Sequence, residues 1–244
     1  MSVKTIGVGI AALLLLGLTG CAGGDTSPAE AGPTQATLTP EVAETPEATA
    51  TAEPTETSEA APQLTDADLA GVFTGLQFIP DQYADTTELL DSIYPGLTAT
   101  DVSCLTPFGA GWDTDPALAD AALEFGTSND RSMTAVISST GDADVAAGLV
   151  ADSVDALERC ATGSDLFTMQ GMAIETQVEQ IDSGITGTDE AVSFRVTGDV
   201  GGSPFSLVGM TARVGGNVLA LVGWDPATSG EYVPQASQMF VDKL

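Results

Sequence analysis

The spacing of apolar side chains predicts one long amphipathic helix. In residues 142–160 these side chains recur every three or four positions, as they do on one face of a helix. The stripe consists of Val145, Leu149, Val150, Val154 and Leu157. Asp142 can cap the start of this helix, and Arg159 in its last turn complements the helix dipole. We therefore predict a helix over residues 142–160 whose apolar face lies in the core.

After this helix the apolar period changes from about four to two, which is typical of strands. Residues 167–181 form one long candidate strand with a bulge near Gly171. Val192, Phe194 and Val196 alternate with polar residues, as in a half-buried strand. Further strands are expected over 205–214 and 218–224, and glycine-rich turns separate them. Such short connections predict an antiparallel meander.

The rest of the folded region adds weaker signals of both kinds. Strands are expected over residues 121–126 and 131–138. Short helices are expected over 64–70, with Thr65 or Asp66 as the cap, and over 87–91. A closing helix is expected over 232–240, with Pro234 in its first turn. Because helices cluster at the two ends and strands follow one another, the predicted class is α+β, an antiparallel meander with helices packed on one face.

The first twenty residues have the pattern of an export signal. Lys4 is followed by apolar residues 6–18, which are too few to span about 30 Å of hydrocarbon comfortably. The segment ends in Leu-Thr-Gly-Cys, which resembles a bacterial lipobox, so Cys21 is expected to become the lipidated first residue. This predicts a signal peptide over 1–20 and an exported protein anchored on the outer side of the cell membrane. The alternatives are an ordinary cleaved signal or an uncleaved anchor.

Residues 21–64 are rich in Thr, Pro, Glu and Ala and contain no aromatic or basic residue. Such a composition cannot bury enough apolar surface to offset the entropy of ordering, so a disordered linker is predicted here. The folded domain is then expected over residues 65–244. The chain carries 35 acidic and 6 basic residues, a formal charge of −29. This charge excludes nucleic-acid binding, which requires clustered Lys and Arg.

The chain has no histidine, which excludes Ser-His-Asp and Cys-His catalysis and His-ligated zinc. No nucleophile elbow, phosphate loop or dinucleotide fingerprint occurs. The acidic segments 66–71 and 113–115 faintly resemble calcium loops, but the first lacks the EF-hand ligand pattern and can instead cap a helix. No cofactor, no metal and no enzymatic activity are therefore predicted.

Cys104 and Cys160 remain once Cys21 is assigned to lipid. An exported chain lies in an oxidising environment, so we predict a disulfide between them. The alternative is a pair of free buried thiols.

Three short motifs resemble one family. Residues 101–107, Asp-Val-Ser-Cys-Leu-Thr-Pro, are similar to its V-S-P-x-x-C segment, and residues 156–161 match its W-x-x-C-A motif with Leu157 in place of tryptophan. Residues 215–220 are similar to its R-G-N-V-V-V strand. The domain thus resembles the PknH-like extracellular sensor domain of actinobacterial Ser/Thr kinases and lipoproteins. The resemblance implies a twisted antiparallel sheet with helices and a ligand-binding cleft, although the second disulfide of many members is absent.

These observations favour a lipid-anchored, non-enzymatic ligand-binding or sensing domain whose ligand or envelope partner is unknown. The candidate cleft residues are Trp112, Arg195, Arg213 and Trp224. The alternative for each tryptophan is core packing, and for each arginine a surface ion pair. Two other functions remain open: an envelope scaffold without a small-molecule pocket, and a hydrolase that uses two facing carboxylates.

Overall fold

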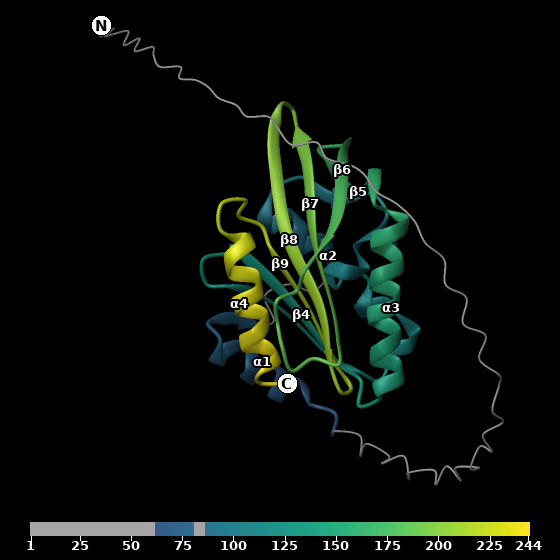
Figure 1. The fold of residues 1–244 in the computed structure, drawn as a ribbon, viewed down its shortest axis with the longest axis vertical. Coiled ribbons are helices and arrows are strands. Elements are labelled where there is room, and N and C mark those ends of the chain that lie inside the picture. Colours follow the sequence, from purple (N-terminus) through teal and green to yellow (C-terminus); the bar gives the residue numbers. More distant parts are fainter. Residues whose placement is uncertain (1–61, 81–85) are drawn as a thin grey trace, which may run out of the picture. The chain divides into compact units, whose positions relative to one another are not determined.

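The computed structural model describes residues 62–80 and 86–244, all of them within the unit Thr55–Leu244. Cys21, the predicted signal peptide and most of the predicted linker therefore lie outside the described residues. The structure is a mixed α+β fold built on a nine-stranded sheet, which confirms the predicted fold class. Figure 1 shows this sheet with helices beside it.

The nine strands pair in the order β1-β3-β4-β9-β8-β7-β6-β5-β2, and every pair is antiparallel. The first four strands are β1 (Phe78–Pro80), β2 (Leu97–Ala99), β3 (Ala122–Ser128) and β4 (Met133–Ser139). The other five are β5 (Thr162–Met169), β6 (Met172–Ile181), β7 (Glu190–Val200), β8 (Ser203–Val214) and β9 (Asn217–Gly223). Strands β5 to β9 form the predicted meander.

The helices are α1 (Asp66–Gly75), α2 (Thr86–Ile93), α3 (Ala143–Arg159) and α4 (Ser229–Val241). Three short 3-10 helices lie between β2 and β3: η1 (Val102–Phe108), η2 (Trp112–Thr114) and η3 (Pro116–Leu118). Helix α1 begins with a capping box in which the Thr65 hydroxyl accepts from the Asp68 backbone N–H. The Asp142 carboxylate caps α3 by accepting from the N–H groups of Asp144 and Val145, as the sequence predicts.

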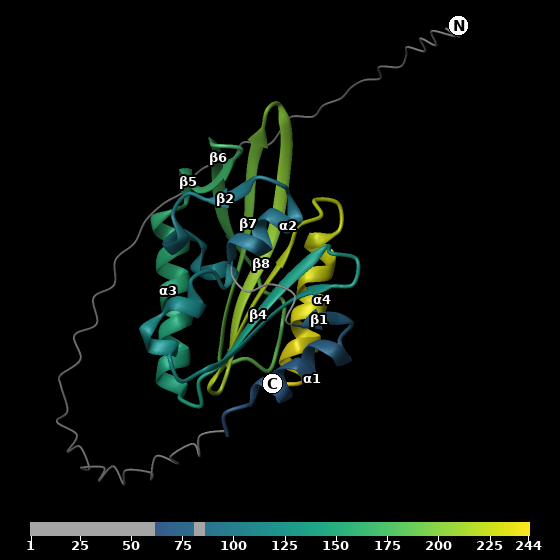
Figure 2. The ribbon, with the colours of Figure 1, turned by 180° about the vertical axis from the view of Figure 1, so that it is seen from behind.

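The helices cover both faces of the sheet, so the predicted placement on one face is wrong. Strand β9 shows why, because its successive side chains enter opposite clusters. Leu219 and Leu221 pack with the α1 and α4 side chains, whereas Val218 and Ala220 pack with α3. Both faces of the central strands are therefore apolar, and each needs a cover. Figures 1 and 2 show α4 and α3 on opposite sides of the sheet.

The long strand predicted over 167–181 is in fact two strands, β5 and β6, joined by a tight turn. Gln170 and Gly171 both have positive φ, 51° and 81°, and Met169 pairs with Met172. Two central residues with positive φ are the mark of the type I′ hairpin turn. The sequence hides this turn because glutamine, unlike asparagine, rarely takes that conformation.

Two smaller differences concern helix and sheet ends. Helix α4 starts at Ser229, so Pro234 lies inside it rather than in its first turn. The edge strands β1 and β2, of three residues each, were not predicted, because such short segments show no alternation.

The structure contains the predicted disulfide. Cys104 in η1 is bonded to Cys160, the residue that follows the last turn of α3, and their Cα atoms are 5.8 Å apart. The bond holds η1 and the end of α3 together on one face of the sheet, and both cysteines are buried.

Candidate functional site

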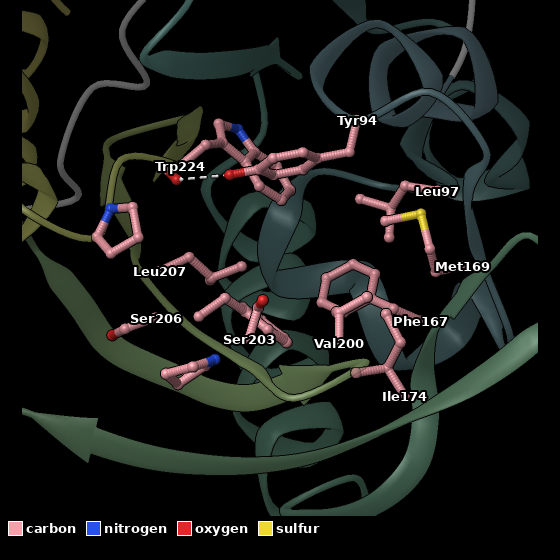
Figure 3. Close-up of a pocket in the computed structure, with 13 residues that line it drawn as sticks. Tyr94, Leu97, Phe167, Met169, Ile174, Val200, Ser203, Ser206, Leu207 and Trp224 are labelled. Carbon is pink, nitrogen blue, oxygen red and sulfur yellow. Dashed lines mark hydrogen bonds between the residues drawn. The ribbon is translucent and has the colours of Figure 1, made fainter. Parts of the chain in front are cut away.

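An apolar cavity of about 310 Å³ lies beside the β7–β8 hairpin (Figure 3). Its walls come from Tyr94, which follows α2, from β2, β5, β6, β7 and β8, and from the residues that follow β9. The lining residues are Tyr94, Leu97, Phe167, Met169, Ile174, Val200, Ser203, Pro204, Phe205, Ser206, Leu207, Trp224 and Pro226.

The cavity exists because β8 is longer than its neighbour β9. The last pair between them is Val208 with Gly223, whereas β8 continues to pair with β7 as far as Ser203. Residues 203–207 therefore have no strand beside them on the β9 side, and the chain after Gly223 turns toward α4. Figure 1 shows the β7–β8 hairpin reaching beyond the rest of the sheet.

Aromatic rings line the inner wall of the cavity. Phe167 and Trp224 are both buried, and their ring centroids lie 6.5 Å apart. Behind them Phe108 of η1 contacts both rings, with centroid distances of 5.8 and 6.2 Å. The disulfide partner Cys104 belongs to the same cluster. The wall is thus held by the tightly packed part of the domain, which favours a preformed cavity.

Two hydrogen bonds fix the groups at the Trp224 side. The indole Nε1–H of Trp224 donates to the hydroxyl of Thr134 in β4 over 2.9 Å, and both residues are buried. The phenol of Tyr94 donates to the backbone carbonyl of Trp224 over 3.3 Å, as Figure 3 shows. Tyr94 is 42% exposed, so it connects the cavity wall to solvent.

The polar groups in the lining are neutral. They are the side chains of Ser203 and Ser206, the Tyr94 phenol and backbone atoms; none of the lining residues is charged. No two carboxylates face each other in the cavity, as a carboxylate hydrolase would require. Among residues 62–80 and 86–244, no group of three His, Cys, Asp or Glu side chains is arranged to hold a metal ion.

Of the four candidate residues, Trp224 lines the cavity and the other three do not. Trp112 is buried in a separate cluster with α3. Arg195 pairs with Glu179 over 3.4 Å. Arg213 pairs with Asp189 and Glu190 over 3.1 and 3.2 Å, near the start of β7.

The sequence predicts little of the cavity beyond Trp224. Tyr94 lies in a segment without periodicity, and Phe167 is the first residue of the long strand predicted over 167–181. Phe205 is the first residue of the strand predicted over 205–214, and its aromatic ring beside a glycine-rich turn is a further signal.

The turn next to Trp224 contains a carboxylate with a lowered pKa. Asp130 accepts hydrogen bonds from the Ser128 hydroxyl over 2.6 Å and from the N–H and hydroxyl of Ser132. The Ser128 hydroxyl lowers the pKa of Asp130 most, because it stabilises the charged form, and Ser132 lowers it further. The carbonyl of Ser132 accepts from the Trp224 backbone N–H, so this turn supports the position of Trp224.

Comparison with solved structures gives a distant likeness in fold to the following chain, among others. No family model matches the chain, and no curated protein matches it. The crystal structure of the extracellular domain of PknH from Mycobacterium tuberculosis is 12% identical with a TM-score of 0.42, over 75% of this chain and 93% of that one. In the part of the chain that the structure describes, no helix has the length and apolar character needed to cross a membrane.

Proposed function

We propose that this chain is an exported lipoprotein, anchored through Cys21, whose domain binds a small apolar ligand in the cavity beside the β7–β8 hairpin. The cavity carries this proposal. Ligand sites in proteins are concave, mostly apolar and supplied with a few polar groups, and volumes of about 300–1,000 Å³ are usual. This cavity, at about 310 Å³, has these properties, and its polar groups are neutral.

The size of the cavity limits the ligand. An apolar cavity of about 150 Å³ accommodates benzene. Twice that volume suits roughly two fused rings or a short alkyl chain. A ligand of this size has roughly 10–12 non-hydrogen atoms. At about 0.3 kcal/mol or more per atom it gains at least about 3–4 kcal/mol, which corresponds to a Kd on the order of 1–10 mM or tighter.

The cavity favours this proposal over the two alternatives. A scaffold needs no internal apolar space of this kind. A carboxylate hydrolase needs two acids facing a cleft, and this cavity is lined by none. We therefore propose a non-enzymatic binding or sensing role, in which the anchor and linker present the domain outside the membrane.

The ligand-binding part is tested with the fluorescent apolar probe N-phenyl-1-naphthylamine. Its fluorescence should rise saturably with the native chain and fall when an apolar competitor is added. Ser203→Trp places a large ring at the cavity wall and should abolish the signal. Glu175→Trp is the matched control, because Glu175 is exposed and follows the lining residue Ile174 on the opposite face of β6. Equal probe binding by both variants would refute the site.

The anchor is tested separately, by labelling cells with palmitate. The native chain should incorporate label and Cys21→Ala should not. Equal incorporation by both would refute the lipoprotein assignment and leave the cavity proposal untouched.

A further inference from the structure

The cavity borders an open edge of strand β8 as well as one of its faces. Five consecutive residues of this strand, 203–207, belong to the lining. Side chains of a strand alternate between its two faces, so a cavity on one face alone would be lined by every second residue. The edge is open because β9 ends beside it, at the pair of Val208 with Gly223. Figure 3 shows Ser203, Ser206 and Leu207 along this border.

The pairing of β9 fixes which backbone groups point to the open edge. In antiparallel strands, successive residues direct their N–H and C=O groups to opposite neighbours. The Trp224 N–H donates to the carbonyl of the residue just before β4, so Gly223 directs its groups to β8. Its pair partner Val208 therefore directs its own groups to β9. Counting back in twos along β8, Ser206 and Pro204 point to the same side, beyond the end of β9.

These two residues present unpaired strand groups. On that side, no hydrogen bond joins the backbone of Ser206 or Pro204 to another residue of 62–80 or 86–244. Ser206 is half-buried and Pro204 is exposed, so solvent reaches the edge. Proline has no N–H. The edge thus offers one donor, the Ser206 N–H, and two acceptors, the carbonyls of Ser206 and Pro204, at the spacing of a strand.

The side chains between them face the cavity. Leu207 and Phe205 both belong to the apolar cluster on this face of the sheet. The Phe205 ring lies against Gly198 of β7, where an added Cβ would come within 2.5 Å of it. The ring is therefore held in the cavity wall. In an antiparallel pair, directly opposite residues place their side chains on the same face, so a residue opposite Phe205 would direct its side chain into the cavity.

We infer that the ligand is an extended peptide, which lies antiparallel to β8 where β9 would continue and places one apolar side chain in the cavity. This inference rests on the proposed function and names its ligand class. The peptide residue before that side chain forms two hydrogen bonds with Ser206, and the residue after it donates to the Pro204 carbonyl. Such strand addition takes affinity from main-chain bonds and specificity from the side-chain pocket.

Size and charge define the peptide further. A cavity of about 150 Å³ accommodates benzene. This cavity, at about 310 Å³, has room for one aromatic side chain and for backbone atoms beside it. No lining residue is charged, so the inserted side chain is neutral. The formal charge of −29 disfavours an acidic peptide.

The probe is the blocked peptide acetyl-Thr-Thr-Phe-Thr-Thr-amide, added to the full chain carrying Cys21→Ala. We expect it to displace N-phenyl-1-naphthylamine and to shift the NMR amide signal of Ser206 saturably. Alanine in place of the peptide's phenylalanine should abolish both effects, because the cavity then stays unfilled.

Two methylated peptides of identical composition test the strand pairing. N-methylation of the threonine before phenylalanine removes the N–H that donates to Ser206, whereas N-methylation of phenylalanine removes an N–H that points away from β8. The first should weaken binding about tenfold or more, because a hydrogen bond is lost and a methyl group meets the strand. The second should change the affinity by less than about twofold.

Two variants test the same contact from the protein side. Ser206→Pro removes the N–H at the open edge, and Pro204 shows that this edge accepts proline. It should lose about tenfold or more of the peptide affinity and still bind N-phenyl-1-naphthylamine. Ser206→Ala is the matched control, since it removes the hydroxyl and keeps the N–H. Circular dichroism verifies that both variants are folded.

The outcomes separate the two claims. If N-phenyl-1-naphthylamine binds but the peptide does not displace it, or if both methylated peptides bind equally well, the peptide assignment is overturned and the apolar site stands. The same follows if sedimentation shows a dimer that Ser206→Pro dissociates, because a second copy then occupies the edge. Binding of neither compound would overturn the proposed function, and this inference with it.

Discussion

The two tryptophans offer a matched test of how this fold is stabilised. Trp112 and Trp224 are 2% and 5% exposed, so both are buried to a similar degree. They differ in their indole N–H groups. That of Trp224 donates to Thr134, whereas that of Trp112 has no hydrogen-bond partner among the described residues. The same substitution, Trp→Phe, therefore has opposite hydrogen-bonding consequences at the two positions.

The expected difference follows from these contacts. Trp224→Phe removes a buried hydrogen bond worth about 1 kcal/mol and leaves the Thr134 hydroxyl short of a partner, which costs about 1–3 kcal/mol more. Trp112→Phe removes a buried donor that is already unpaired, and this gain offsets much of its loss of packing. Trp224 borders the cavity, so truncating its ring removes fewer packing contacts, and we use the lower end of the range of about 1–3 kcal/mol. The free energy of unfolding of Trp224→Phe should then be about 2 kcal/mol lower than that of Trp112→Phe.

Urea unfolding followed by far-ultraviolet circular dichroism measures this difference without relying on tryptophan fluorescence. For a domain of this size, 2 kcal/mol corresponds to a gap of about 4–8 °C in Tm. Thr134→Val supplies the control, because its effect and that of Trp224→Phe should not add if the two groups form one interaction. The reasoning is refuted if Trp112→Phe destabilises the protein as much as Trp224→Phe does.

Three further predictions concern stability. Reduction of the disulfide, which spans a sequence separation of 56, should lower the free energy of unfolding by about 4 kcal/mol, measured by urea titration with and without reductant. Gly209→Ala would bring a Cβ into the Phe194 ring and should cost about 1–3 kcal/mol, whereas Gly148→Ala in α3 meets no atom and should stabilise by about 0.5–1 kcal/mol. The check is that the two substitutions change Tm in opposite directions. The lowered pKa of Asp130 means that its carboxylate stabilises the fold above its unfolded pKa near 3.9 and that this stabilisation disappears as the pH falls further. Asp130→Asn should therefore flatten the acid side of a Tm–pH curve, and an unchanged curve would contradict the assignment.

The sequence was most informative where a local rule decides the structure. The apolar stripe and the Asp142 cap were sufficient to place α3 within one residue at each end. The disulfide was predicted from export to an oxidising environment and from the two cysteines that remain once Cys21 is assigned to lipid. The helix follows from one contiguous segment, and the disulfide follows from the single pairing that two cysteines allow.

The sequence was least informative where distant segments meet. Both faces of the sheet are covered because residues 218–222 of β9 are all apolar. A strand of seven buried residues does not say which helix covers which face. The cavity depends on the register between β8 and β9 and on Tyr94, which reaches Trp224 across 130 positions of the chain. Such a register is set by tertiary packing and leaves no periodic signal in the sequence. For this reason the sequence could not locate the cavity, and of the four candidate residues Trp224 lines it while the other three do not.

The most direct test of the central claim uses Trp224 as its own reporter. In Trp112→Phe it is the remaining tryptophan, because the chain has two. Bromonaphthalene, a neutral apolar quencher, should reduce its fluorescence saturably, since a bound ring would lie against the indole in the cavity. In Trp224→Phe the remaining Trp112 belongs to another cluster and should show only weak, unsaturable quenching. Saturable quenching confined to Trp224 is the result that the cavity predicts. Equal quenching of both tryptophans, or none of Trp224, would contradict it.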